Sequence, residues 1–214
     1  MPAGLAIDGI LLLDKSTGPS SNQALQRVKR LFEARKAGHA GTLDPLATGL
    51  LPILLGEATK FASFSSEAGK AYEATVLLGV RTSSGDLAGD VIEPRPVTVG
   101  RVAVESALER FRGRISQTPP MHSALKHQGE PLYRIARRGD VVSRQPRTVE
   151  ITMLSLLNIR GDELYLRVEC SKGTYIRVLA EDLGAALGCG ATLKRLRRTG
   201  VGDFGVDAAH EADA

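Results

Sequence analysis

The pattern of apolar and polar positions predicts a chain that mixes strands with helices. The apolar run at residues 9–14 is typical of a buried strand, and the alternation over residues 71–80 predicts a strand with one buried face. Two further β-like runs, residues 149–159 and 164–170, flank a Gly-Asp pair and predict a hairpin. A last, basic strand is expected to end near residue 204, followed by a frayed acidic tail.

Apolar residues at helical spacing predict three longer helices and one short helix. The first begins after Ser20, which has capping-box spacing to Gln23. Two others cover residues 98–112 and 175–187, each followed by a glycine that acts as a stop. A short helix is expected between residues 131 and 139. Because strands and helices do not follow a strict βαβ repeat, the expected fold class is α/β (α+β), with a mixed, largely antiparallel central sheet and flanking helices.

Composition narrows the possible functions. A chain of 214 residues with 43% hydrophobic residues is long enough to bury a sizeable core without disulfides. No apolar run approaches the roughly 20 residues that span a bilayer, and no export signal is recognisable, so a cytoplasmic location is expected. Cys170 and Cys189 are expected to be small buried apolar residues. The histidines lack metal-ligand spacing, and nucleotide-binding and hydrolase motifs are missing, so no metal or cofactor is expected.

Positive charge is concentrated in two segments. The formal net charge of +4 is by itself weak evidence for nucleic-acid binding. Five arginines lie between residues 134 and 147, and four basic residues lie between residues 194 and 198. Each cluster is either a solvated surface or a contact for phosphates, and the pattern leaves both interpretations open.

The most informative segment is glycine-rich, residues 38–49, with the sequence GHAGTLDPLATG. Its glycines allow tight turns and a close approach to a ligand, and Asp44 is fixed ahead of Pro45. An Asp-Pro pair commonly begins a turn. A carboxylate on a rigid loop can equally serve as a nucleophile or a base. Residue chemistry alone leaves both roles open for Asp44.

Five segments in this order resemble those of the tRNA pseudouridine synthase B (TruB) family, and together they cover about residues 9–204. They read GILLLDK, AGHAGTLDPLATGLLPILLGEATKF, KAYEATVLLG, CSKGTYIRVLAEDLG and LKRLRRTGVG. The resemblance implies a pseudouridine synthase fold and an isomerase that converts uridine to pseudouridine in the T-loop of tRNA, at position 55. Its partner would be the T-arm of tRNA, with the target base flipped out. The reaction needs no metal, nucleotide or redox cofactor, because both halves of the substrate stay in the pocket.

The same resemblance implies roles for the residues that would act on the uridine. Asp44 would be the catalytic carboxylate, by attack on the sugar or the base or by removal of a sugar proton, and these routes stay open. Tyr72 would stack on the uracil, and its hydroxyl could help the proton transfer at carbon 5. Tyr175 would line the pocket, and Arg177, expected to point the same way on extended backbone, would pair with Asp44.

Two further residues are implied to contact RNA or the base. His39 would occupy the place that the flipped base leaves, and Leu196 would pack near the base while its basic neighbours face phosphates. The chain departs from the family pattern at Ser16, where a proline is usual, and at His122, where an aromatic ring is usual. The first departure loosens a turn, and the second puts a stacking contact in doubt.

The resemblance also sets the expected organisation. We expect a single catalytic domain over residues 1–214, a basic RNA-contacting insertion at about 119–147, and no C-terminal RNA-binding (PUA) domain, hence weaker tRNA binding than in longer relatives. The protein is expected to be a monomer without a protein partner or a membrane. Two alternatives remain: a tRNA chaperone that does not need catalysis, and a guide-RNA-dependent relative, against which the spacing and the lack of long basic tails argue.

Overall fold

The computed structural model describes residues 4–211, with the backbone alone for residues 64–66 and 93, and it divides the chain into two compact units. Unit 1 contains the residues up to Glu73 and those from Arg195 onward, and unit 2 is Ala74–Lys194. Strands β4 (Lys70–Leu78) and β12 (Ala191–Val201) contribute residues to both units. The single domain expected over residues 1–214 stays a prediction.

Unit 1 is built on a sheet with the order β14-β1-β3-β12. Apart from β4 and β12, the strands of unit 1 are β1 (Gly9–Lys15), β2 (Ala37–His39), β3 (Thr48–Leu55), β13 (Phe204–Gly205) and β14 (His210–Glu211). Strand β3 is antiparallel to β1 and β2 but parallel to β12, where Arg198 lies opposite Gly49. The acidic tail is therefore not frayed over its first part, because β14 pairs in parallel with β1.

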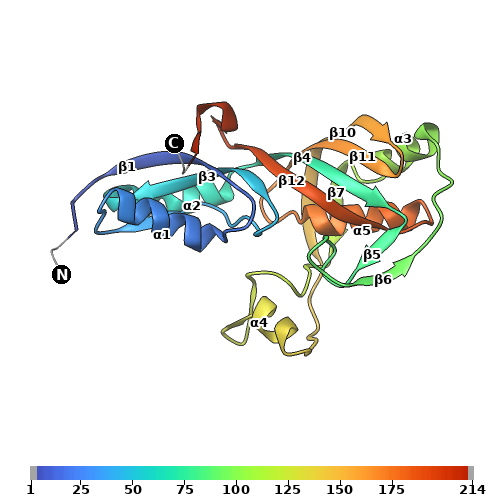
Figure 1. Cartoon of the computed structure of the whole chain (residues 1–214), viewed down its shortest axis with the longest axis horizontal. Helices are drawn as coiled ribbons and strands as arrows, with labels where there is room; N and C mark the ends of the chain where they lie inside the picture. The colour runs from blue at the N-terminus through green and yellow to red at the C-terminus, as the bar shows by residue number, and fades with distance from the viewer. Residues whose placement is uncertain (1–3, 212–214) are drawn as a thin grey trace. The chain divides into compact units, whose positions relative to one another are not determined.

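The helical elements of unit 1 are α1 (Ser21–Leu31), the 3₁₀ helix η1 (Gly56–Phe61), α2 (Ala62–Glu67) and the 3₁₀ helix η2 (Val206–Ala208). The predicted capping box of α1 is confirmed: Ser20 accepts from the Gln23 amide, and the Gln23 side chain accepts from the Ser20 amide. The buried face of α1, which includes Leu25 and Val28, packs toward β2 and β3 (Figure 1). Since β3 is buried along nearly its whole length, it forms the core of this unit.

Unit 2 contains a sheet with the order β4-β11-β10-β7 and two short hairpins. The strands are β5 (Val80–Thr82), β6 (Val91–Pro94), β7 (Gly113–Gln117), β8 (Lys126–His127), β9 (Glu130–Pro131), β10 (Arg147–Arg160) and β11 (Glu163–Cys170). The predicted hairpin is confirmed, because β10 and β11 are antiparallel and Gly161 between them has a positive φ of 55°.

Three helices complete unit 2: α3 (Arg101–Glu109), α4 (Leu132–Arg137) and α5 (Ile176–Ala186) (Figure 1). Helix α3 is shorter than the pattern predicted, because Gly113 opens β7 instead of directly ending the helix. Helix α5 ends as predicted before Gly188, which has a φ of 79°. The structure thus confirms a mixed, largely antiparallel sheet with flanking helices, and it adds strands β3 and β7, which the hydropathy pattern did not predict.

Candidate active site

The segment that carries Asp44 links β2 to β3 in unit 1, and backbone contacts hold it on both sides. The Ser21 hydroxyl, buried in the first turn of α1, donates to the Leu43 carbonyl (2.9 Å) and accepts from the Leu43 amide (2.7 Å). The Gly18 amide donates to the Pro45 carbonyl (2.8 Å). The Asp44 carbonyl accepts from the Ala47 amide (3.0 Å), which closes a turn. The half-buried Asp44 therefore sits on a rigid loop.

A buried arginine of β12 contacts both ends of this loop. Arg198 is 1% exposed. Its Nε donates to the Leu50 carbonyl (2.7 Å), and its Nη2 and Nη1 donate to the Gly41 carbonyl (3.1 Å) and the Thr42 carbonyl (3.5 Å). Because a guanidinium can only donate, it matches a set of carbonyl oxygens. The expectation that the basic neighbours of Leu196 face phosphates is wrong for Arg198, whose side chain points into the core of unit 1.

Tyr72 on β4 is the fourth partner of this guanidinium. Its side chain is 8% exposed and forms a hydrogen bond with Arg198. Burial lowers the pKa of Arg198 from its usual value, while Tyr72 opposes this shift. A guanidinium nevertheless stays charged in proteins. The result is a fixed positive charge beside a phenol.

A second buried cation lies near Asp44. Lys15, at the end of β1, is 1% exposed, and its Nζ donates to the carbonyls of Ser16 (2.8 Å) and Pro19 (2.9 Å). Burial lowers the pKa of Lys15 to about 8; the charge of Asp44 opposes this shift, and the charge of Arg198 adds to it. These electrostatic interactions place Lys15, Asp44 and Arg198 in one neighbourhood.

His39 and Leu196 belong to the same unit. Both are half-buried. Burial, and then the charge of Arg198, lower the pKa of the His39 imidazole, and its Nδ1 has no hydrogen-bond partner within residues 4–211. Leu196 precedes Arg198 by two residues on β12, so the two side chains share one face of the strand. Four of the six predicted site residues, namely His39, Asp44, Tyr72 and Leu196, therefore lie in unit 1.

The other two predicted site residues, Tyr175 and Arg177, lie in unit 2. Tyr175 is the extended N-cap residue of α5; its amide donates to the Gln117 side chain (3.0 Å). Arg177 is already helical, so the idea that both residues point the same way on extended backbone is wrong. The predicted pairing of Arg177 with Asp44 stays a prediction.

Arg177 is 5% exposed and has its own partners in unit 2. Its Nη1 donates to the Ser84 carbonyl (3.0 Å), its Nη2 donates to the His122 carbonyl (2.7 Å), and its Nε lies 3.7 Å from an Asp86 carboxylate oxygen. The carboxylate offsets the cost of a positive charge in the first turn of a helix. The structure therefore assigns Asp86 a charge-balancing position that the sequence pattern did not single out.

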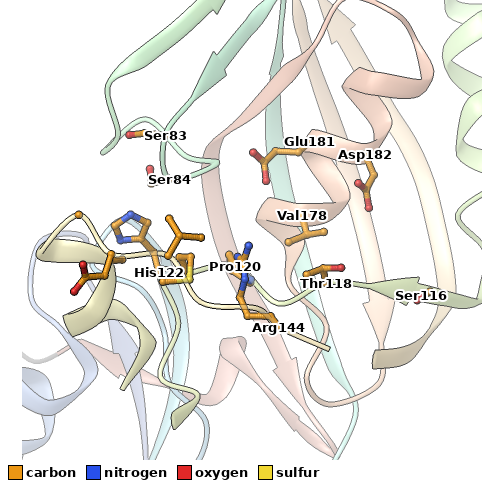
Figure 2. Close-up of a pocket in the computed structure, with 15 residues that line it drawn as sticks. Ser83, Ser84, Ser116, Thr118, Pro120, His122, Arg144, Val178, Glu181 and Asp182 are labelled. Carbon is orange, nitrogen blue, oxygen red and sulfur yellow. The ribbon is translucent and has the colours of Figure 1, made fainter. Parts of the chain in front are cut away.

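A pocket of about 590 Å³ also lies in unit 2, beside the predicted insertion (Figure 2). Glu181 and Asp182 reach it from α5, while Pro120 and Arg144 come from the irregular segment. Burial raises the pKa of both carboxyl groups. The Arg144 Nη1 donates to the Pro119 carbonyl (3.1 Å), and its buried Nε has no partner within the described chain. The pocket is thus polar, with both hydrogen-bond donors and acceptors.

Within residues 4–211 no group of three or more His, Cys, Asp or Glu side chains is arranged to hold a metal ion. No helix of this part of the chain is long and apolar enough to cross a bilayer. Cys170 and Cys189 are buried, as predicted.

Comparison with known proteins identifies relatives over nearly the whole chain. A family model described as TruB family pseudouridylate synthase (N terminal domain) matches residues 29–176, and the model for the tRNA pseudouridylate synthase B C-terminal domain matches residues 177–213. The chain is 58% identical over 209 residues to tRNA pseudouridine synthase B of Burkholderia mallei (strain NCTC 10247), covering 98% of this chain and 69% of that protein. It is also 58% identical over 198 residues to tRNA pseudouridine synthase B of Ectopseudomonas mendocina (strain ymp), covering 92% of this chain and 65% of that protein.

Solved structures agree with these relatives. A chain from the crystal structure of a Cbf5-Nop10-Gar1 complex superposes with a TM-score of 0.75 at 33% identity, over 95% of this chain and 52% of that chain. A chain from an H/ACA RNP bound to a substrate RNA containing 2'-deoxyuridine gives 0.73 at 30% identity, over 96% and 51%. The chain thus spans about half the length of these solved chains.

Proposed function

Because this chain belongs to the TruB family of pseudouridylate synthases, we propose that it isomerises uridine to pseudouridine in tRNA, with Asp44 as the catalytic carboxylate. The target is the uridine of the T-loop, position 55. The observation that carries this assignment is the arrangement in unit 1, where Asp44 lies on a clamped loop beside two buried cations. A carboxylate that is held in a fixed position on such a loop can act as a nucleophile or as a base.

The chemistry requires positioning and proton transfer. The bond between N1 and the sugar breaks, the uracil turns, and a bond forms between its carbon 5 and the same sugar carbon. Carbon 5 loses a proton and N1 gains one, so atoms and electrons balance without an oxidant or a reductant. Tyr72 stacks on the uracil and its hydroxyl assists the transfer at carbon 5, which its burial next to Arg198 supports. Leu196, on the same strand face as Arg198, packs near the base.

The remaining predicted residues act on the rest of the substrate. Extruding the base costs a few kcal/mol, and His39 would fill the space that the base leaves in the RNA. A largely neutral imidazole suits this place, because its lowered pKa leaves it a hydrogen-bond donor and acceptor. Tyr175 lines the uridine pocket, and Arg177 is proposed to pair with Asp44 and keep it aimed. The basic segment at about 119–147 contacts the T-arm.

We also propose that the protein is a monomer that acts on tRNA in the cytoplasm, and that both units form one catalytic domain. The chaperone alternative is not favoured, since the family models that match this chain describe synthases.

The test is product mapping. The protein is incubated with an unmodified tRNA transcript, without added cofactor or metal, and pseudouridine is located by chemical modification and primer extension. We expect one pseudouridine, at position 55, and none in a transcript whose only change is cytidine at that position. Pseudouridine at another position would overturn the substrate assignment, and no product at any position would overturn the enzyme assignment.

A further inference from the structure

Arg198 is a buried cation whose hydrogen-bond partners are all uncharged. The acceptors within residues 4–211 are the carbonyls of Gly41, Thr42 and Leu50 and the phenol of Tyr72. Burying a charge without an opposite charge is costly, and an apolar side chain of similar size usually serves packing at least as well. Packing alone therefore does not explain an arginine at this position.

The positions of the acceptors explain it better. Gly41 and Thr42 precede Asp44, and Leu50 follows it, so one planar group fixes both ends of the loop that carries the carboxylate. Backbone packing reinforces the contact: a Cβ atom on Gly49 would lie 2.2 Å from the Arg198 carbonyl oxygen. The β3 and β12 backbones therefore approach closely here, next to the carbonyls that the guanidinium contacts.

The bond to Tyr72 has a defined direction. Since a guanidinium has donors only, the phenol oxygen must accept from Arg198. On the basis of the proposed function, we propose that Arg198 is a positioning residue, which holds the Asp44 loop and the Tyr72 oxygen in one fixed arrangement.

Lysine cannot reproduce this arrangement. Its ammonium is a point charge without the planar fork that contacts four oxygens at once. We therefore expect Arg198→Lys to slow single-turnover pseudouridine formation about 30-fold, which is less than the roughly 100-fold or more that a general acid or base contributes directly, while the Kd for tRNA changes less than about threefold. Arg112→Lys is the matched control. Arg112 Nε (3.1 Å) and Nη2 (2.9 Å) also donate to a backbone carbonyl, that of Leu154, but in unit 2, so its rate should stay within about twofold of wild type.

A double-mutant cycle separates positioning from general loosening of the fold. If Arg198 acts through the Tyr72 hydroxyl, Arg198→Lys should cost at least about fivefold less in a Tyr72→Phe background than in wild type. An equal rate loss in both backgrounds, or a rate loss that follows only a lowered Tm, would overturn the proposal.

A measurement on the wild-type protein covers the case in which Arg198→Lys does not fold. In ¹⁵N-labelled protein, the Arg198 guanidinium should give separate, slowly exchanging Nη proton signals, and Tyr72→Phe should shift them. A freely rotating Arg198 guanidinium, or signals unchanged by Tyr72→Phe, would contradict the proposal. This readout does not depend on activity, so it distinguishes failure of the positioning role from failure of the proposed function.

Discussion

Each unit contains a buried arginine, and the two arginines have different kinds of partners. Arg177 donates to two backbone carbonyls and has the Asp86 carboxylate 3.7 Å away. Arg198 donates to three carbonyls and a phenol and has no carboxylate among its partners within the described chain. Arg177 thus has a carboxylate close by, whereas the pKa of Lys15 and that of His39 are lowered first by burial and then further by the charge of Arg198. The two units therefore differ in the groups that surround a buried arginine.

The largest expected effect comes from removing the negative charge next to Arg177. Asp86→Asn takes away the carboxylate that lies 3.7 Å from the buried Arg177 guanidinium. We expect the free energy of unfolding to fall by about 3 kcal/mol, measured by urea denaturation. Asp90→Asn, an exposed carboxylate in the same turn-rich segment, is the control and should change it by less than about 0.5 kcal/mol. Equal effects of the two substitutions would show that Asp86 does not balance Arg177.

The close approach of β3 and β12 gives a slightly smaller effect. Gly49 has a φ of 99°, and a Cβ atom there would meet the Arg198 backbone, so Gly49→Ala should destabilise the fold by about 2–3 kcal/mol. Gly188→Ala is the control, because Gly188 also has a positive φ but no heavy atom within 4 Å of a built Cβ. It should cost only the backbone strain, about 1 kcal/mol. If Gly49→Ala costs no more than Gly188→Ala, the two backbones are not tightly packed.

The pH dependence of stability tests the burial of Lys15, the second cation near Asp44. Burial lowers the folded-state pKa to about 8 from 10.5, so between these values the unfolded state binds more protons and stability rises with pH. Relative to Lys15→Met, the wild type should gain free energy of unfolding between about pH 8 and 10.5, by roughly 1–3 kcal/mol. Below pH 8 the difference should be constant. Urea denaturation of both proteins at several pH values gives this difference, and a pH-independent difference would contradict the shift.

The smallest effect is expected for the arginine next in sequence to Arg198. Arg197 lies on the opposite face of β12 and pairs with Asp14, and its side chain is 41% exposed. Arg197→Gln should reduce the free energy of unfolding by less than about 1 kcal/mol, because solvent screens such pairs. Thermal denaturation measures this change. A loss above about 2 kcal/mol would mean that the contrast between the two faces of β12 is wrong.

Local signals made much of the fold predictable. The capping box at Ser20, the β10–β11 hairpin and the stop at Gly188 each depend on a few neighbouring residues, and each is confirmed. Strand β3 was missed because its apolar run contains Pro52, which normally argues against a central strand. Strand β3 forms by pairing with strands from other parts of the chain, so its local sequence does not predict it.

The site residues were likewise predictable only where the local sequence carries the signal. The loop motif predicts Asp44 and the resemblance adds Tyr72, whereas the basic neighbours of Leu196, Arg198 among them, are expected to face phosphates. Alternation along a strand places Arg198 on the same face as Leu196, which is predicted to pack near the base. Its partners Gly41, Thr42 and Leu50 could not be predicted, because that contact depends on the parallel pairing of β12 with β3.

The most direct test of the account is single-turnover conversion of a tRNA transcript by Asp44→Asn, with the tRNA Kd measured in parallel. The exposed Asp162→Asn, in the β10–β11 turn, is the matched control. Loss of an acid–base or nucleophilic carboxylate predicts a rate at least about a thousandfold lower, a Kd within about threefold, and an unchanged control. A rate within tenfold of wild type would mean that Asp44 only forms a turn, and would contradict the account.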